Sequence, residues 1–254
     1  MNKLKIREIF TYLFRCDDWV LKSITIIGLF FIPIIGWLAI RGYYIRITKK
    51  WIYREYDTLP DFSNFWNLVS TGFKNFLVGF LLSIPALVIA LIWIASIPIG
   101  LSFHNRVLTL IIIVIAIFFS FILSILYSLF LGLILPYIYS AIALDKSYSE
   151  ILDLSRIKKY LKENIVNSLI FMGIWFGLGT AQSIITTPLN IVANAIATVH
   201  DKFILTYPPS LGIYFLSLGI SVILGIYTSS VLYSLAGNIY DIWISKNKFS
   251  ESQM

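Results

Sequence analysis

Four long stretches of the chain contain no Asp, Glu, Lys or Arg. They cover residues 75–103, 107–144, 164–200 and 203–240. Hydrocarbon offers no water to backbone N–H and C=O groups, so an apolar stretch longer than about 18 residues is typical of a membrane-spanning helix. The pattern therefore predicts an all-α protein, a polytopic membrane helical bundle with four full spans.

A shorter apolar stretch precedes Arg41, and basic residues lie on both sides of it. Pro33 and Gly36 interrupt this stretch. Proline removes a helical hydrogen bond and glycine supplies turn conformations. We therefore predict a proline-broken helical hairpin over residues 23–54, re-entrant or shallow, with both ends on the same side of the membrane. The alternative is a pair of short, tilted spans, of which the second continues through Tyr53.

Three further segments place apolar residues along one helical face and polar or basic residues along the other. The first runs from Leu4 to Arg15, and the second starts near Asp61. The third starts at Ser147, where Glu150 stands at capping-box spacing. Each segment predicts an amphipathic helix at the membrane surface.

The second and third amphipathic segments each lead into a pair of spans. This order favours two pseudo-repeats within one membrane domain, although any protein with an even number of spans and basic inner loops would show the same order. In the third apolar stretch, Pro188 is expected to end the span and to precede a short surface helix over residues 190–200. The predicted parts of the single domain 1–254 are an interfacial helix (1–22), the hairpin (23–54), two pseudo-repeats (61–144 and 147–240) and a tail (241–254).

Composition and charge agree with membrane residence and predict a topology. The chain has 58% hydrophobic and 13% charged residues and a net charge of +7. Lys and Arg cluster in residues 1–22, 41–74 and 145–163, and the positive-inside rule places these segments and the tail in the cytoplasm. The protein is thus expected in the cell membrane with both termini cytoplasmic.

The excess of positive charge predicts contact with anionic lipid headgroups. It does not predict nucleic-acid binding, because no soluble basic domain is present to carry it. The candidate headgroup-binding residues are Lys3, Lys5, Arg7, Arg46, Lys49, Lys50, Lys158 and Lys159.

No motif in the chain indicates a metal, a cofactor or a reaction. The single cysteine, Cys16, excludes an internal disulfide, and the two histidines, His104 and His200, stand far apart in the sequence. Ionisable residues are missing from the middle of every span, which argues against proton- or ion-coupled transport. We therefore predict no metal site and no cofactor.

One polar patch interrupts the third apolar stretch and is a candidate ligand-binding surface. Its hydroxyl and amide groups could line a cavity, or they could bond to carbonyls within and between helices, which is the interpretation that we favour. The candidate ligand-binding residues are Gln182, Ser183, Thr186, Thr187 and Asn190.

Two rows of small residues occur at helical spacing. Such rows let helices approach closely in lipid, so they predict internal packing or a dimer interface rather than a channel. The residues are Gly173 and Gly177 in one row, and Ser217, Ser221, Gly225 and Ser229 in the other.

Four short motifs follow one another in the first quarter of the chain. They are D-D-W-x-x-K at 17–22, P-x-x-G at 33–36, G-Y-x-x-R at 42–46 and L-P-D-F at 59–62. This order resembles a family of archaeal and bacterial multi-pass membrane proteins that is known only as a domain of unknown function. The resemblance continues over most of the chain. It implies a membrane helical fold and no particular activity.

Three functional hypotheses follow from these features. The first is a scaffold or a membrane subunit of an envelope or transport assembly, with a second copy or another membrane protein as partner. The alternative is a transporter or lipid-handling protein with a cavity between the pseudo-repeats, near Gln182 and Thr186. An enzyme acting on headgroups is third, and would depend on Asp17, Asp18 or Asp61 at the cytoplasmic interface.

Overall fold

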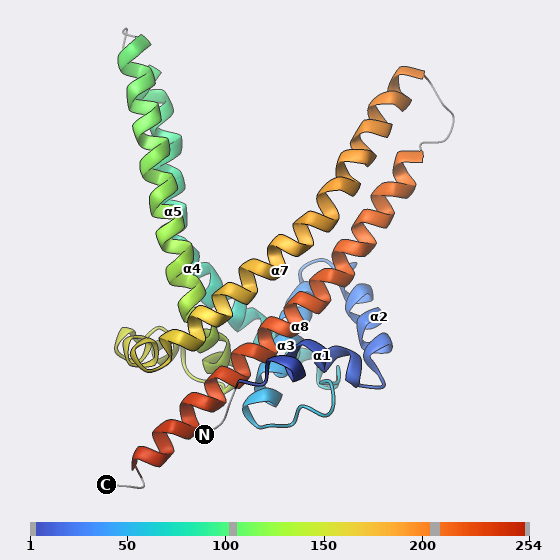
Figure 1. Cartoon of the computed structure of the whole chain (residues 1–254), viewed down its shortest axis with the longest axis vertical. Helices are drawn as coiled ribbons and strands as arrows, with labels where there is room; N and C mark the ends of the chain where they lie inside the picture. The colour runs from blue at the N-terminus through green and yellow to red at the C-terminus, as the bar shows by residue number, and fades with distance from the viewer. Residues whose placement is uncertain (1–3, 102–105, 204–208, 252–254) are drawn as a thin grey trace.

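The computed structural model describes residues 4–101, 106–203 and 209–251. Within these ranges the chain forms helices and short connections and no strand, which confirms the predicted fold class (Figure 1). The helices are α1 (Ile6–Arg15), α2 (Trp19–Phe30), α3 (Ile35–Ile52), α4 (Phe65–Leu101), α5 (Arg106–Ala143), α6 (Tyr148–Ile151), α7 (Leu154–Phe203) and α8 (Pro209–Glu251).

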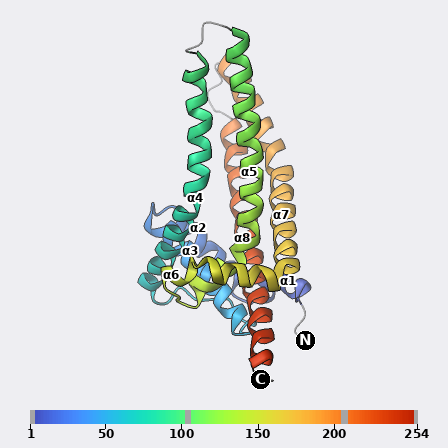
Figure 2. The same cartoon turned by 90° about the vertical axis from the view of Figure 1, so that its left-hand side faces the viewer.

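Four helices are long and apolar enough to cross a membrane, as predicted. Their apolar portions are Phe65–Ile92, Val107–Ala143, Leu154–Val192 and Leu216–Asn247. Helix α4 pairs with α5 and helix α7 pairs with α8, and the two hairpins lean apart like the arms of a V (Figure 1). In the view turned by 90°, all four helices rise in one direction from a shared base (Figure 2). Whether the hairpins are true repeats stays a prediction.

The base consists of α1, α2, α3, α6 and the adjoining ends of the long helices, and α3 lies at its centre. Helix α3 packs against α4, α5 and α8, and so contacts both arms. Large side chains such as Tyr43 and Trp51 are each only 1% exposed. The Thr48 hydroxyl donates a hydrogen bond of 2.9 Å to the Tyr233 carbonyl oxygen on α8. The base therefore holds the buried core that the exposed arms lack.

Glycine residues allow the backbones in the base to approach very closely. A Cβ atom on Gly42 of α3 would lie 1.9 Å from the Leu68 carbonyl oxygen on α4. Conversely, a Cβ atom on Gly72 of α4 would lie 1.8 Å from the Leu38 carbonyl oxygen. On the other side of α3, a Cβ atom on Gly237 of α8 would lie 2.5 Å from the Thr48 carbonyl oxygen of α3. These contacts are closer than any residue with a side chain permits.

The turn between α2 and α3 confirms the break that the proline predicted. Ile34 has a φ of 62°, and a Cβ atom on Gly36 would lie 1.9 Å from the backbone of α2. Phe31 is 76% exposed and Ile34 is 74% exposed, although both are large and apolar. The turn points in the same direction as the arms and rises only part of their length (Figure 1). Insertion into one leaflet, as a re-entrant or shallow hairpin, stays a prediction.

The first predicted amphipathic helix forms as α1, the second begins later than expected, and the third is interrupted, because α6 ends at Ile151 and the chain becomes helical again only at Leu154 of α7. Helix α1 buries Ile9, Tyr12 and Leu13 along one face. Helix α6 begins with the predicted capping box between Ser147 and Glu150. The second predicted helix does not start at residue 61, because residues 61–64 form a turn in which Asp61 accepts bonds from Ser63. Helix α4 starts at Phe65 and continues directly into the span.

Helix α7 is interrupted at a different place from the one that the sequence suggested. Asn164 has non-helical angles and separates the basic start of α7 from its apolar part. Pro188, in contrast, lies inside the helix, which runs on to Phe203 without a separate surface helix. Proline is tolerated in membrane helices because neighbouring groups satisfy the carbonyls that it leaves free. The expectation that Pro188 ends the span is therefore wrong.

We predict that Gly42→Ala destabilises the protein by about 1–3 kcal/mol or more, because the methyl group overlaps the α4 backbone. Thermal unfolding of the full chain in detergent measures the effect. Gly28→Ala is the matched control, because a Cβ atom on Gly28 meets no atom within 4 Å. Equal melting temperatures for the two variants would contradict this account of the base.

We also predict that the α6 connection loses stability in acid. The Ser147 backbone N–H and the Arg156 guanidinium both bond to Glu150 and hold its pKa below the ordinary value of 4.5. A lowered pKa in the folded state contributes stability above the unfolded value, and this stability is lost as the pH falls through the folded value. The melting temperature should therefore drop less between about pH 7 and about pH 3.5 in Glu150→Gln than in wild type. Equal decreases of the melting temperature in wild type and Glu150→Gln would show that Glu150 does not contribute to the loss of stability in acid.

Candidate functional site

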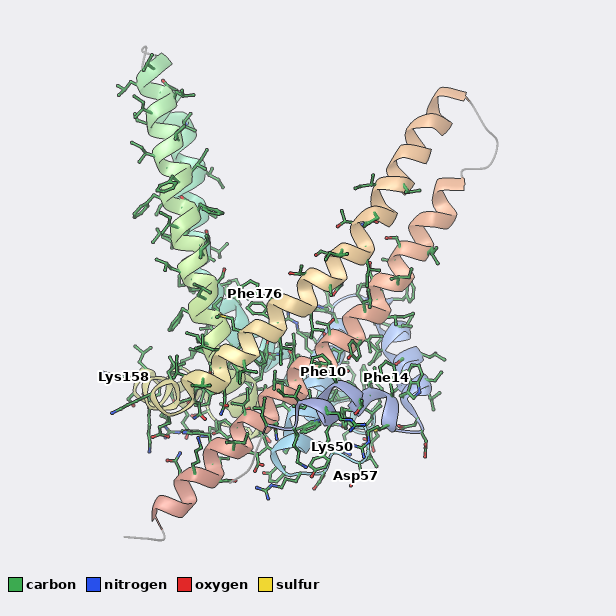
Figure 3. The ribbon with its side chains drawn as sticks, viewed as in Figure 1. Phe10, Phe14, Lys50, Asp57, Lys158 and Phe176 are labelled. Carbon is green, nitrogen blue, oxygen red and sulfur yellow. The ribbon has the colours of Figure 1, made fainter. Side chains whose placement is uncertain are left out.

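A cavity of about 670 Å³ lies at the junction of the two arms and the base, lined by residues of α2, α3, α4, α5, α7 and α8. We call it the junction cavity. Trp175 of α7 is part of the cavity lining. The next residue, Phe176, is labelled in Figure 3 close to the point where the two arms diverge. Most of the wall is apolar. Apolar residues of the wall include Ile26, Phe30, Leu82, Phe171, Val222 and Ile226.

Polar side chains from four helices line the same cavity. Tyr44 comes from α3, Asn75 from α4, Tyr139 from α5 and Tyr233 from α8. The Tyr233 ring stacks on Tyr139 at a centroid distance of 4.4 Å and on Tyr44 at 5.4 Å. The Asn75 amide donates a hydrogen bond of 3.3 Å to the Tyr233 hydroxyl. These contacts connect both arms to α3 and give the cavity one polar side.

Arg41 is the charged residue of the cavity lining. Its guanidinium lies over the Trp37 ring at 3.9 Å from the centroid, and the side chain is half-buried. The lining contains no Asp or Glu, and none of the ion pairs formed within the described part of the chain involves Arg41. The cavity therefore combines an apolar wall with one positive charge that no carboxylate balances.

An apolar groove of about 510 Å³ between α2 and α8 continues the cavity sideways. We call it the side groove. Phe30, Leu218 and Val222 line both spaces. Phe31 and Pro33 from the exposed α2–α3 turn line the outer part of the groove, opposite Ile223 of α8. The junction cavity and the side groove are thus neighbours that share these three side chains.

The predicted ligand-binding patch lies outside the junction cavity. None of its residues is part of the cavity lining. The Ser183 hydroxyl donates a 2.9 Å bond to the Gly179 carbonyl oxygen, and Thr186 donates a 3.0 Å bond to the Gln182 carbonyl oxygen. Asn190 accepts a 2.7 Å bond from Ser217 of α8. These are the bonds within and between helices that the favoured interpretation expects. A ligand at this patch, including Thr187, stays a prediction.

The two predicted rows of small residues differ in their surroundings. A Cβ atom on Gly173 or Gly177 meets nothing within 4 Å, so these residues are not close-packing positions within one copy of the chain. In the second row, Ser217 is 3% exposed and lies against α7. The remaining members of that row line the junction cavity; they are Ser221, Gly225 and Ser229.

Several predicted headgroup-binding residues already bind other parts of the protein. Arg46 donates to the carbonyl oxygens of Asp61 and Ser63, and its partial burial lowers its pKa. Lys49 pairs with Asp145 at 3.2 Å. These contacts fasten the connections beneath the arms, and they leave fewer of the predicted basic residues to reach lipid.

The other predicted headgroup-binding residues lie nearer the surface or bind within the base. Lys50 donates to Thr58 at 2.6 Å, and Lys5 pairs with Glu8 and hydrogen-bonds to the Tyr56 hydroxyl, which raises the Lys5 pKa. Figure 3 labels Lys50 on the side of the base away from the arms and Lys158 at its outer edge. Among the described residues of the predicted set, four are exposed, namely Arg7, Lys49, Lys158 and Lys159. Lys3 lies outside the described residues.

The carboxylates of the enzyme hypothesis have structural contacts. Asp18 precedes α2 and pairs with Lys22 at 3.4 Å, although its side chain does not cap the helix. Asp61 accepts hydrogen bonds from Ser63, which is the main reason that its pKa is lowered. Asp17 is exposed.

Sequence reasoning missed the residues of the polar side of the junction cavity. Arg41 was counted only as a basic flank of the hairpin. Tyr139 and Tyr233 stand inside stretches that were interpreted as apolar spans. One signal was available, because an arginine one turn after a tryptophan favours stacking of the two side chains. No pattern in the sequence indicates that four helices distant along the chain meet around Trp37 and Arg41.

The chain was compared with known proteins. It matches the family described as "Protein of unknown function (DUF4013)" over residues 25–191. No curated protein and no solved structure matched the chain. The matched region begins in α2 and ends in α7, so it includes Arg41, Asn75 and Tyr139. Because the match covers more than half of the chain and contains three of the four motifs, the protein belongs to this family of unknown function.

Proposed function

We propose that the protein is a cell-membrane protein that holds a lipid or a lipid-like amphiphile in the junction cavity. The observation that carries this proposal is that the cavity adjoins the apolar side groove and shares Phe30, Leu218 and Val222 with it. Small-molecule sites measure about 300–1,000 Å³ and are mainly apolar with a few polar groups. The volume of about 670 Å³ and the one-sided polarity of the junction cavity fit this description.

The distribution of exposed apolar residues supports a membrane position for the groove. Large apolar side chains such as Phe118 and Phe121 on α5 are 65% and 63% exposed, as expected of lipid-facing positions. The α2–α3 turn exposes Phe31 and Ile34 at the mouth of the side groove. With the basic base on the cytoplasmic side, both termini would be cytoplasmic and the groove would face the inner leaflet.

The charge distribution favours holding or presenting a lipid over ion-coupled transport. The cavity lining contains no carboxylate, and the spans carry no ionisable residue at mid-depth that could relay a proton or bind a cation. A site without such groups can still bind and release a lipid. We therefore propose lipid handling without ion coupling.

A scaffold or subunit role is the second candidate, and the open face of α7 favours it. Gly173 is exposed, and Gly177 one turn later is exposed too. Close helix approach in membranes uses such G-x-x-x-G faces. A second copy of the chain or another membrane subunit could pack there without disturbing the junction cavity.

We predict that Gly225→Leu strongly reduces lipid retention. A Cβ atom on Gly225 meets no atom within 4 Å, so leucine can enter the cavity without a backbone clash. Native mass spectrometry of the protein in mild detergent should detect co-purified lipid on wild type and at least about tenfold less on the variant, a change of about 1.4 kcal/mol. Gly28→Leu, on the α2 surface outside both spaces, is the matched control. Equal retention by the two variants would refute the proposal.

We predict for the second candidate that Gly173→Ile reduces self-association several-fold, because the larger side chain prevents close helix approach. Chemical cross-linking of the full chain in nanodiscs at fixed protein concentration measures the dimer fraction. Gly28→Ile is the control. A wild-type protein that remains monomeric and captures no membrane partner would remove this candidate.

A further inference from the structure

We infer that the molecule held in the junction cavity is an anionic phospholipid of the inner leaflet, with its phosphate bound by Arg41. This inference rests on the proposed function and adds the chemical class of the ligand. It depends on the state of the Arg41 side chain, on the composition of the cavity lining and on the path that leads from the cavity to the membrane.

The contact between Arg41 and Trp37 leaves the guanidinium able to bind an anion. The charged group lies over the ring at 3.9 Å from its centroid. In a stacked arrangement the ring occupies one face of the guanidinium, and the N–H donors point outward in the plane of the group. Those donors match two oxygens of a phosphate. No hydrogen bond from Arg41 to an oxygen acceptor is found within the described residues, so its donors can serve a phosphate while the charge lies over Trp37.

The residues that line the cavity favour a ligand with a negative charge. Arg41 has no carboxylate partner among the residues that line it, and most of its neighbours there are apolar. A cation beside hydrocarbon is unfavourable unless an anion or water compensates it. Asn75 and the tyrosines add neutral hydrogen-bonding groups on the same side of the cavity. A phosphate would balance the charge of Arg41, while a headgroup without any anionic group would leave that charge uncompensated.

The position of Arg41 agrees with the depth of a lipid phosphate. Arg41 follows Ile34 by seven residues on α3, which is about 10 Å at 1.5 Å per residue. With the exposed α2–α3 turn inserted into the leaflet, Arg41 would lie near the headgroup layer, since half of the hydrocarbon core is about 15 Å thick. The acyl chains would pass Phe30 and Val222 into the side groove. A free phosphate would leave these apolar surfaces empty, so the geometry favours a lipid.

Native mass spectrometry on the delipidated full chain in detergent tests the inference. Wild type should bind phosphatidylglycerol at least about tenfold more tightly than diacylglycerol with the same acyl chains. Arg41→Gln should remove most of this preference and keep diacylglycerol binding, and Arg41→Lys should keep part of it, because lysine supplies charge without the bidentate geometry. Arg15→Gln removes the same charge from an exposed position on α1 that is not among the predicted headgroup-binding residues, and it should behave as wild type.

The outcomes separate the inference from the proposed function. If wild type binds neither lipid, the proposed function fails as well. If it binds both lipids equally, or if Arg41→Gln and Arg15→Gln weaken phosphatidylglycerol binding alike, only the inference fails. Competition by millimolar inorganic phosphate would show a free-anion site instead and would also overturn it. The melting temperature of Arg41→Gln is measured alongside; if that variant does not fold, the preference shown by Arg41→Lys decides.

Discussion

The close backbone contacts of α3 with α4 and α8 are the constraint on which the rest of the structure depends. Lipid surrounds apolar helices as favourably as other helices do, so association in a membrane requires tight packing. Gly42 and Gly72 bring α3 and α4 within that range, and Gly237 does the same for α3 and α8. Because α4 belongs to one arm and α8 to the other, a single helix holds both arms at the base.

The junction cavity follows from this arrangement. The arms are fixed to α3 at their lower ends and lean apart above it (Figure 1). Side chains near α3 meet across the gap, as the stacked rings of Tyr44, Tyr139 and Tyr233 do. Higher up, the small residues Ser221 and Gly225 leave space between the arms. The stacked tyrosines of the cavity lining therefore lie where α3 meets the two arms.

Much of the fold could be predicted from the sequence because its signals are local. A long stretch without charged residues indicates a membrane span whatever the rest of the fold is. A capping box such as that of Ser147 and Glu150 depends only on two residues three positions apart. The break at Pro33 is local as well, since the proline ring removes a hydrogen bond from its own helix. Whether a helix continues through a proline such as Pro188 depends instead on the groups around it. For this reason the expectation that Pro188 ends its span was wrong although the same reasoning succeeded at Pro33.

The candidate site could not be predicted because it depends on contacts between distant residues. Gly173 and Gly177 have the regular spacing that suggests packing, yet no atom of the chain lies near their Cβ positions. Gly42 and Gly237 show no such row, and only the fold brings each against a backbone. Arg41 was similarly ambiguous, because a basic residue beside an apolar stretch usually marks the membrane boundary.

The side groove gives a reason why binding would not require the arms to move. A ligand enclosed on every side can leave only when helices separate, and packed helices resist separation. Here the wall between α2 and α8 is a groove that reaches the exposed turn at Phe31 and Pro33. A lipid could therefore enter along the plane of the leaflet with its chains always in apolar surroundings, while its phosphate approaches Arg41. The packing around α3 that fixes the arms would then also keep the cavity open, so stability of the base and access to the site are compatible.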